Sequence, residues 1–162
     1  MSLYLYFENM ASKSVWGPIV WTFFHTIAEK VRDEQFHKML PSMLIYIKRI
    51  CANLPCPDCS KHATQYISKI NETQFVTKES FKIFLMNFHN SVNFRTGKPL
   101  FTVEQLNERY PRAITMVVVS NFIKVYSHRN TNIKLLINSF HKDILVKDLI
   151  KWFRENANNF NK

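Results

Sequence analysis

Glycine is nearly absent from this chain, with only 2 glycines among 162 residues. Turn-rich β folds and glycine-rich phosphate loops need more glycine than that, because glycine supplies backbone conformations that other residues avoid. Hydrophobic residues nevertheless make up 46% of the sequence and aromatic residues 14%. The composition therefore predicts a helical, globular domain with an ordinary hydrophobic core, and it excludes a disordered chain.

Cysteine is also sparse. Three cysteines are too few for the disulfide framework of a small secreted protein, and they suit an intracellular redox or metal protein better. No apolar run approaches the length needed to cross a bilayer, and the N-terminus shows no signal-peptide pattern. We therefore expect an intracellular protein without a membrane span.

Acidic residues are few relative to basic ones, which gives a formal net charge of +10. The surplus is densest in residues 111–162, where 9 Lys and Arg residues stand against 3 Asp and Glu residues. Such a surplus favours acidic partners, anionic membranes or nucleic acid. Because the basic residues form no dense run, a solvated basic surface is favoured over nucleic-acid binding.

The chemistry is concentrated in one short stretch, residues 54–62, which reads L-P-C-P-D-C-S-K-H. Proline is favoured in the first turn of a helix, so Pro57 places Cys56 at the N-cap. Unpaired backbone N–H groups and the helix dipole favour a thiolate there. Cys59 follows one turn later, within disulfide reach of Cys56. The pattern indicates a reactive dithiol.

Two other interpretations of this stretch stay open. The CxxC pair and His62 could belong to a zinc site, but a structural zinc ion needs four ligands, and His25 or His89 would have to complete the set. The two cysteines could also be incidental residues of a core helix, although the flanking prolines and the polar S-K-H favour a functional site. Cys51 lies on an apolar helix and is interpreted as a buried free thiol.

Apolar residues recur at helical spacing through much of the chain. They predict helices over residues 14–31, 35–52, 57–70 and 77–92, with G-K-P at 97–99 ending the fourth, and a short helix over 103–109. The predicted fold class is an all-α core, a four-helix bundle plus a short fifth helix.

The predicted domain organisation has three parts. Residues 1–13 form a leader that is disordered or was added in cloning, and residues 14–110 form the main domain. The β-branched run I-T-M-V-V-V-S after Pro111 fits a strand or a buried helix equally well. Residues 111–162 are therefore expected to be a C-terminal appendage of α or α+β fold, packed on the core.

Three spaced motifs then occur together in one order. They read W-G-P-I-V-W-T-F-F-H at 16–25, L-P-C-P-D-C-S-K-H at 54–62 and F-H-N-S-V-N-F-R-T-G-K-P at 88–99. Over residues 14–110 the sequence resembles the Erv/ALR family of FAD-linked sulfhydryl oxidases, most closely the short versions of large cytoplasmic DNA viruses. The resemblance implies a helical bundle that binds FAD and oxidises thiols with oxygen, giving hydrogen peroxide.

The resemblance also implies which residues would act. A substrate thiolate would attack Cys56, and Cys59 would pass the electrons to the flavin. Lys98 would neutralise phosphate charge, and Tyr110 stands where the family usually has a tryptophan. The cofactor-binding residues carried over from the motifs are Trp16, Gly17, Trp21, His25, His62, His89, Asn90, Val92, Asn93, Lys98 and Tyr110.

Departures from the family pattern narrow the expected partners. No cysteine follows Cys59 or precedes Cys51, so the shuttle pair and the additional disulfide of many members are absent. We expect a thioredoxin-like or other dithiol protein as electron donor, oxygen as acceptor, and a homodimer. A viral origin would place the protein in the host cytoplasm or the virion. Pro18 and Thr96 replace a common arginine and a common leucine.

One alternative function belongs to a different class of protein. A non-catalytic interaction module could keep a degenerate oxidase core and present the basic residues 111–162 to a partner. The intact CxxC pair favours the enzyme over that module.

Overall fold

A computed structural model describes residues 12–127 and 136–162, with side chains from residue 139 onward in the second range, and the regular elements within these ranges are helices. The α-helices are α2 (Lys13–Lys30), α3 (Phe36–Ala52), α4 (Pro57–Ile67), α5 (Lys78–Arg95), α6 (Val103–Arg109), α7 (Thr115–Tyr126) and α8 (Leu136–Asn156). Short 3-10 helices are η1 (Asp33–Gln35), η2 (Glu72–Gln74), η3 (Tyr110–Arg112) and η5 (Ala157–Asn159). The predicted all-α fold is confirmed.

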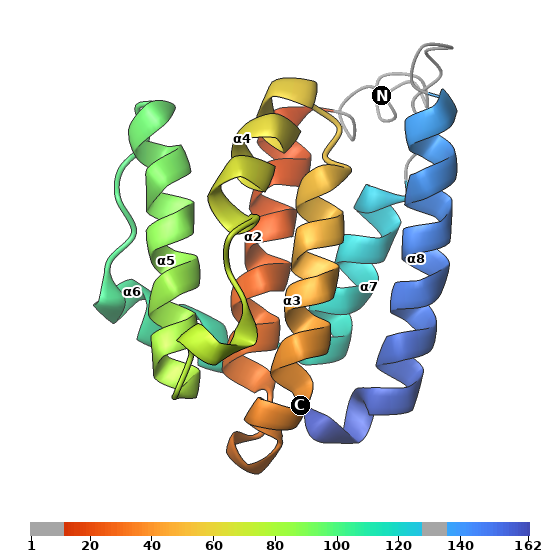
Figure 1. Cartoon of the computed structure of the whole chain (residues 1–162). Coiled ribbons are helices and arrows are strands. Elements are labelled where there is room, and N and C mark those ends of the chain that lie inside the picture. Colours follow the sequence, from red (N-terminus) through yellow and green to blue (C-terminus); the bar gives the residue numbers. More distant parts are fainter. Residues whose placement is uncertain (1–11, 128–135) are drawn as a thin grey trace, which may run out of the picture.

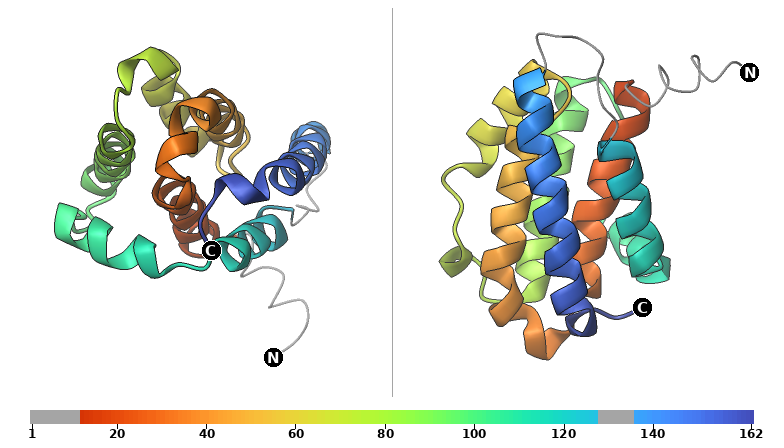
Figure 2. Two further views of the ribbon diagram at one scale, coloured as in Figure 1. Left: turned by 90° about the horizontal axis from the view of Figure 1, so that it is seen from below. Right: turned by 90° about the vertical axis from the view of Figure 1, so that its right-hand side faces the viewer.

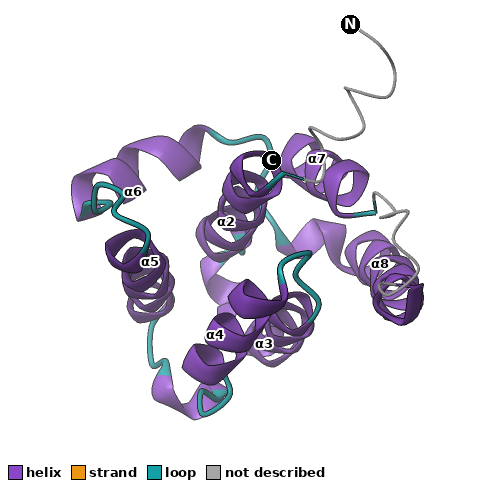
Figure 3. Ribbon diagram, turned by 90° about the horizontal axis from the view of Figure 1, so that it is seen from above, coloured by secondary structure: helices purple, strands orange, loops and turns teal. Residues whose placement is uncertain are grey.

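Five helices, α2, α3, α5, α7 and α8, run roughly along one direction, while α6 lies across their lower end (Figure 1). Seen from above, α2 occupies the middle, with α5 and α6 to one side, α3 and α4 to another, and α7 on a third (Figure 3). α8 lies outermost, beside α3 and α7 (Figure 2). The start of α2, the end of α3, the start of α4 and the end of α5 therefore meet at the upper end.

The end of α5 is set by a glycine. The helix continues to Arg95, beyond the predicted residue 92, and Gly97 then takes a left-handed conformation with φ of 67°. The Lys98 N–H donates to the Asn93 carbonyl at 2.9 Å and the Gly97 N–H to the Phe94 carbonyl at 3.3 Å, a Schellman closure. The predicted stop at G-K-P is confirmed, and it turns Lys98 back toward the body of α5.

The predicted dithiol helix is shorter than expected. It ends at Ile67 and not at residue 70, because Lys48 of α3 donates to the Ile70 carbonyl and Asn71 begins η2 with a capping box. The Ile70 carbonyl and the Asn71 side chain therefore form hydrogen bonds with groups outside α4. The connection to α5 therefore runs back along α3 (Figure 1).

The strand-or-helix ambiguity after Pro111 resolves to helices. The β-branched run forms α7, whose buried residues Val119, Phe122 and Tyr126 pack into the core shared with α2 and α3. Phe122 stacks on Phe23 of α2 at a ring-centroid distance of 4.2 Å. A domain boundary at residue 110 stays a prediction, since the hydrophobic core continues across it.

One sequence prediction, the leader over residues 1–13, falls largely outside the described residues, which begin at residue 12. Lys13, placed in the leader by the sequence, is the first residue of α2. None of the helices in the described ranges combines the length and apolar character that crossing a bilayer requires.

Candidate functional site

The dithiol sits at the start of α4 as predicted. Cys56 is the N-cap, Pro57 is the first helical residue, and the Cys59 N–H donates to the Cys56 Sγ at 3.3 Å. Ser60 Oγ donates to the Cys51 carbonyl at 2.8 Å, which ties the first turn of α4 to the last turn of α3. Cys56 and Cys59 are both half-buried free cysteines, while Cys51 is buried.

The thiols of Cys59 and Cys51 both have pKa values above that of an ordinary cysteine, mainly because they are buried. Burial raises the pKa of Cys51 to about 12. Burial first, and then the hydrogen bond and charge of Cys56, raise the pKa of Cys59, while the ammonium of Lys13 acts in the opposite direction. The first residue of α2 therefore lies close enough to the dithiol for its charge to act on Cys59.

A cavity of about 250 Å³ lies beside Cys59, between α2, α4 and α5 and below the end of α3. The sequence-predicted residues that line it are Cys59, Trp16, Gly17, Trp21, His89, Val92, Asn93, Lys98 and Tyr110. Further lining residues that sequence reasoning missed include Lys13, Leu54, Phe88, Arg95 and Arg109. The three motifs therefore converge on one cavity.

Aromatic rings form one wall of the cavity in two layers. Trp21 and His89 stack face to face, with ring centroids 4.3 Å apart and planes 9° apart. Behind them, His25 Nε2 lies 3.1 Å from His89 Nδ1, and the His25 ring stacks on Tyr110 at 4.7 Å. His25 is buried behind the wall and is not one of the lining residues.

The histidine pair is neutral at physiological pH. Burial lowers the pKa of His25 to about 3, helped by the neighbouring His89 and Arg109. Burial, Arg109 and Lys98 lower the pKa of His89 to about 4. Because both rings are uncharged, one N–H of the pair donates and the other ring nitrogen accepts. The wall is polar but carries no charge.

The rim of the cavity is positively charged. Lys13, Arg95, Lys98 and Arg109 line it, and no Asp or Glu is found among the described lining residues. The Arg109 guanidinium also lies 5.7 Å from the centre of the Tyr110 ring. Such a distribution of charge favours an anionic ligand. The sequence could have pointed to both arginines, because Arg95 lies inside the third motif and Arg109 directly precedes Tyr110.

Besides His25, three of the predicted site residues do not line the cavity. Asn90 exchanges two hydrogen bonds of 2.8 Å with the backbone of Phe101, which holds the 96–102 connection against α5. His62 is exposed on α4 and does not line the cavity, and Cys56 does not line it either. Across the described ranges, no group of three or more His, Cys, Asp or Glu side chains could hold a metal ion, so the zinc interpretation gains no support.

Comparison with known proteins supplies independent information. The family model described as Erv1 / Alr matches residues 18–111. Protein 347L of Invertebrate iridescent virus 6 is 34% identical over 92 residues, which cover 53% of this chain and 83% of that protein. The FAD-linked sulfhydryl oxidase of African swine fever virus (isolate Warthog/Namibia/Wart80/1980) is 28% identical over 103 residues, 64% of this chain and 86% of the viral protein.

A plant protein matches the same region. The FAD-linked sulfhydryl oxidase ERV1 of Oryza sativa subsp. japonica is 31% identical over 97 residues, 58% of this chain and 48% of the rice protein. No solved structure matches the chain significantly. α7 and α8 lie beyond the family match, which covers more than half of the chain and includes the second and third motifs and all but the first two residues of the first. The chain therefore belongs to the Erv1/Alr family.

Proposed function

We propose that this protein is an FAD-dependent sulfhydryl oxidase, which forms disulfides in thiol substrates and passes the electrons to oxygen, giving hydrogen peroxide. The observation that carries the proposal is the placement of Cys59, since one cysteine of an N-capped CxxC pair lines an aromatic, cationic cavity. The viral and plant relatives are named as FAD-linked sulfhydryl oxidases, which agrees with the proposal.

The residues around the cavity fit FAD. Its flavin ring needs flat apolar walls and a few polar contacts, which Trp21, Phe88 and His89 provide. Its pyrophosphate needs cations, which Lys13, Arg95, Lys98 and Arg109 provide.

The two cysteines divide the work according to their positions. Cys56 lies outside the cavity lining and Cys59 within it, so Cys56 meets the substrate. A substrate thiolate attacks Cys56 Sγ of the Cys56–Cys59 disulfide, forming a mixed disulfide and releasing Cys59 as a thiolate beside Lys13. A second substrate thiolate attacks the substrate sulfur, releasing the substrate disulfide and the Cys56 thiolate.

The dithiol has then gained two electrons. FAD, when bound, supplies the two-electron acceptor that is reoxidised by oxygen. The protein contributes geometry and charge: the Cys59 N–H donates to Cys56 Sγ, and the positive charge of Lys13 favours the Cys59 thiolate. The neutral histidine pair keeps the aromatic wall free of formal charge.

The electron donor follows from the absence of further cysteines. With three cysteines in the chain and no shuttle pair, we infer that the dithiol takes electrons directly from a thioredoxin-like or other dithiol protein. A homodimer and an intracellular location belong to the same proposal and stay predictions.

The decisive experiment is a visible spectrum of the purified protein before and after dithiothreitol is added in air. A flavin band that bleaches and recovers while peroxide accumulates supports the oxidase. A flavin-containing Cys59→Ser variant should lose turnover. A colourless protein that takes up no added FAD would contradict the oxidase and favour the non-catalytic module.

A further inference from the structure

A tyrosine of α7 reaches the end of the helix that leads into the dithiol. The Tyr126 hydroxyl donates to the Asn53 carbonyl at 2.9 Å and lies 3.4 Å from the Ile50 carbonyl. The side chain is 1% exposed, so water cannot replace this contact. Burial raises the pKa of Tyr126 well above its usual value, which keeps the hydroxyl a donor.

The Asn53 carbonyl, at the C-cap of α3, has no partner within the helix, whereas the Ile50 carbonyl already accepts from the Asn53 N–H at 3.0 Å. The last carbonyls of an α-helix lack intrahelical partners, and burying them unpaired is costly. At the end of α3 they are divided between two neighbours, because Ser60 of α4 donates to Cys51 and Tyr126 of α7 to Asn53. Only Leu54 and Pro55 separate Asn53 from Cys56. The hydroxyl thus holds the backbone immediately before the reactive cysteine.

Tyr126 is itself tied to α2 through stacked aromatic rings. Its ring stacks on Phe122 at 4.9 Å, and Phe122 stacks on Phe23 of α2 at 4.2 Å. α2 carries Trp16 and Trp21, which line the cavity, while Cys51 and Leu54 line it from the end of α3. The chain of contacts from Phe23 through Tyr126 to Asn53 therefore sets the start of the dithiol loop relative to the aromatic wall.

We propose that Tyr126 is a positioning residue for the Cys56–Cys59 dithiol, acting from a helix beyond the family match. At the N-cap of α4 the Cys59 N–H donates to Cys56 Sγ at 3.3 Å, a contact that stabilises a Cys56 thiolate, and only the reduced dithiol carries that thiolate. Holding residues 50–53 in place favours that N-cap geometry, and so favours the reduced dithiol over the disulfide. The effect on turnover rests on the proposed oxidase function, whereas the effect on the dithiol does not.

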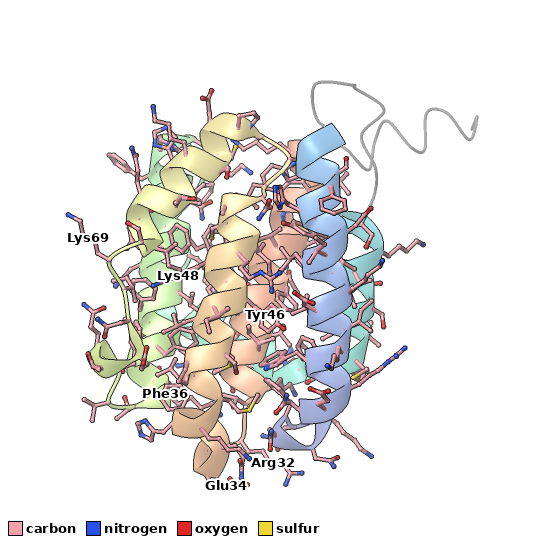
Figure 4. All side chains as sticks on the ribbon, turned by 45° about the vertical axis from the view of Figure 1, so that its right-hand side comes forward. Arg32, Glu34, Phe36, Tyr46, Lys48 and Lys69 are labelled. Atoms are coloured by element: carbon pink, nitrogen blue, oxygen red, sulfur yellow. The ribbon has the colours of Figure 1, made fainter. Side chains whose placement is uncertain are left out.

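The test compares Tyr126→Phe with Tyr46→Phe in the full-length, FAD-containing protein. Tyr126→Phe keeps the ring stack and removes only the hydroxyl. Tyr46 on α3 is a matched control, because its hydroxyl also donates to a backbone carbonyl of another helix, Asp148 of α8, at 3.1 Å (Figure 4). That contact involves neither the end of α3 nor a cavity-lining residue.

The main measurement is the redox equilibrium of the Cys56–Cys59 pair against glutathione without oxygen. The enzyme disulfide and two glutathione thiols exchange with the enzyme dithiol and glutathione disulfide, and trapped cysteines are counted by mass spectrometry. We expect Tyr126→Phe to shift this equilibrium about three- to tenfold toward the enzyme disulfide, the size expected for one lost hydrogen bond. Turnover with dithiothreitol should fall through kcat with little change in KM, and Tyr46→Phe should change neither quantity.

The outcomes separate positioning from general support of the fold. A folded Tyr126→Phe variant with an unchanged glutathione equilibrium would overturn the proposal, even if its melting temperature fell. A variant that no longer folds would also overturn it, because the hydroxyl would then support the whole bundle. Absence of flavin and turnover in the unmodified protein would refute the oxidase function, while the glutathione equilibrium would still decide the role of Tyr126.

Discussion

The rings of Trp21 and His89 stack with their planes only 9° from parallel, although Trp21 belongs to the first motif and His89 to the third. His25 completes this contact from behind, through a nitrogen–nitrogen distance of 3.1 Å to His89. A pair of neighbouring histidines in a cavity rimmed by cations stays ordered only while both rings remain uncharged. Acid should therefore weaken the core of the site.

The sign of this pH effect follows from the shifted pKa values. Unfolded histidines take up a proton near pH 6.5, whereas His25 and His89 in the folded protein do so near pH 3 and pH 4. Between these limits the unfolded chain binds more protons. The pair's contribution to stability is therefore fully present above pH 6.5 and is lost as the pH falls toward 4. Because one pKa unit corresponds to about 1.4 kcal/mol, we expect a loss on the order of 5 kcal/mol from this pair across that interval.

Urea denaturation at pH 7, 5.5 and 4 measures the effect. His25→Phe removes the more deeply buried of the two titrating groups and should flatten the pH dependence of the free energy of unfolding. His62→Gln is the control, because His62 is exposed on α4, and it should leave the pH dependence unchanged. Parallel curves for His25→Phe and the unmodified protein would contradict the prediction.

The three cysteines should respond differently to replacement by serine. Cys56→Ser and Cys59→Ser each remove half of the dithiol, and we expect turnover to fall by at least about a hundredfold with the flavin retained. Cys51 is buried, and the raised pKa of its thiol, about 12, keeps it protonated. Cys51→Ser should keep the flavin and most of the turnover. Oxygen consumption with dithiothreitol and the visible spectrum measure both quantities.

A large loss of turnover in Cys51→Ser with normal flavin content would show that Cys51 takes part in the electron relay. Loss of flavin together with turnover would instead indicate that the lining of the cavity has been disturbed, since Cys51 belongs to it.

The cationic rim should control cofactor affinity. Lys98 lines the cavity and is turned toward α5 by the closure at Gly97. We expect Lys98→Gln to raise the Kd for FAD about three- to tenfold, and the difference from the unmodified protein to shrink at high salt, because screening weakens exposed charge pairs. Lys61→Gln, on the exposed side of α4, should leave the Kd unchanged. Fluorescence titration of the FAD-free protein measures these values, and equal effects of both replacements would contradict a local role.

Sequence reasoning reached the site through motifs and missed what lies between them. Apolar spacing and caps predicted the first five helices. The three motifs supplied seven cavity-lining residues besides Cys59, and the family resemblance added Tyr110. Lys13 escaped because it precedes the first motif. The spacing of apolar residues in the β-branched run of α7 could not distinguish a helix from a strand, because a buried helix and a buried strand are both apolar throughout. Tyr126 and Asn53 are 73 positions apart, and nothing local to either residue signals their contact.

Lys30 is a buried lysine that joins three parts of the chain. Its ammonium donates to the carbonyls of Pro111 at 2.7 Å and Lys162 at 2.8 Å. Close by, the Asn161 N–H donates to the Lys30 carbonyl at 2.7 Å, and Thr115 Oγ1 donates to the Asn161 carbonyl at 2.6 Å. The end of α2, the connection to α7 and residues 160–162 are thus held by one cation and the bonds around it.

Lys30→Met keeps most of the apolar stem but leaves two carbonyls without their donor. We expect it to lower the free energy of unfolding by about 2 kcal/mol, because hydrogen bonds from a charged group are stronger than neutral ones and these carbonyls are partly buried. Lys151→Met is the matched control: its side chain is exposed and lies 3.9 Å from Glu155, so the loss should stay below about 0.5 kcal/mol. Equilibrium urea unfolding compares the two variants. Similar losses in both would mean that Lys30 contributes no more than a surface lysine, and that the packing of α7 on α2 alone secures the C-terminal helices.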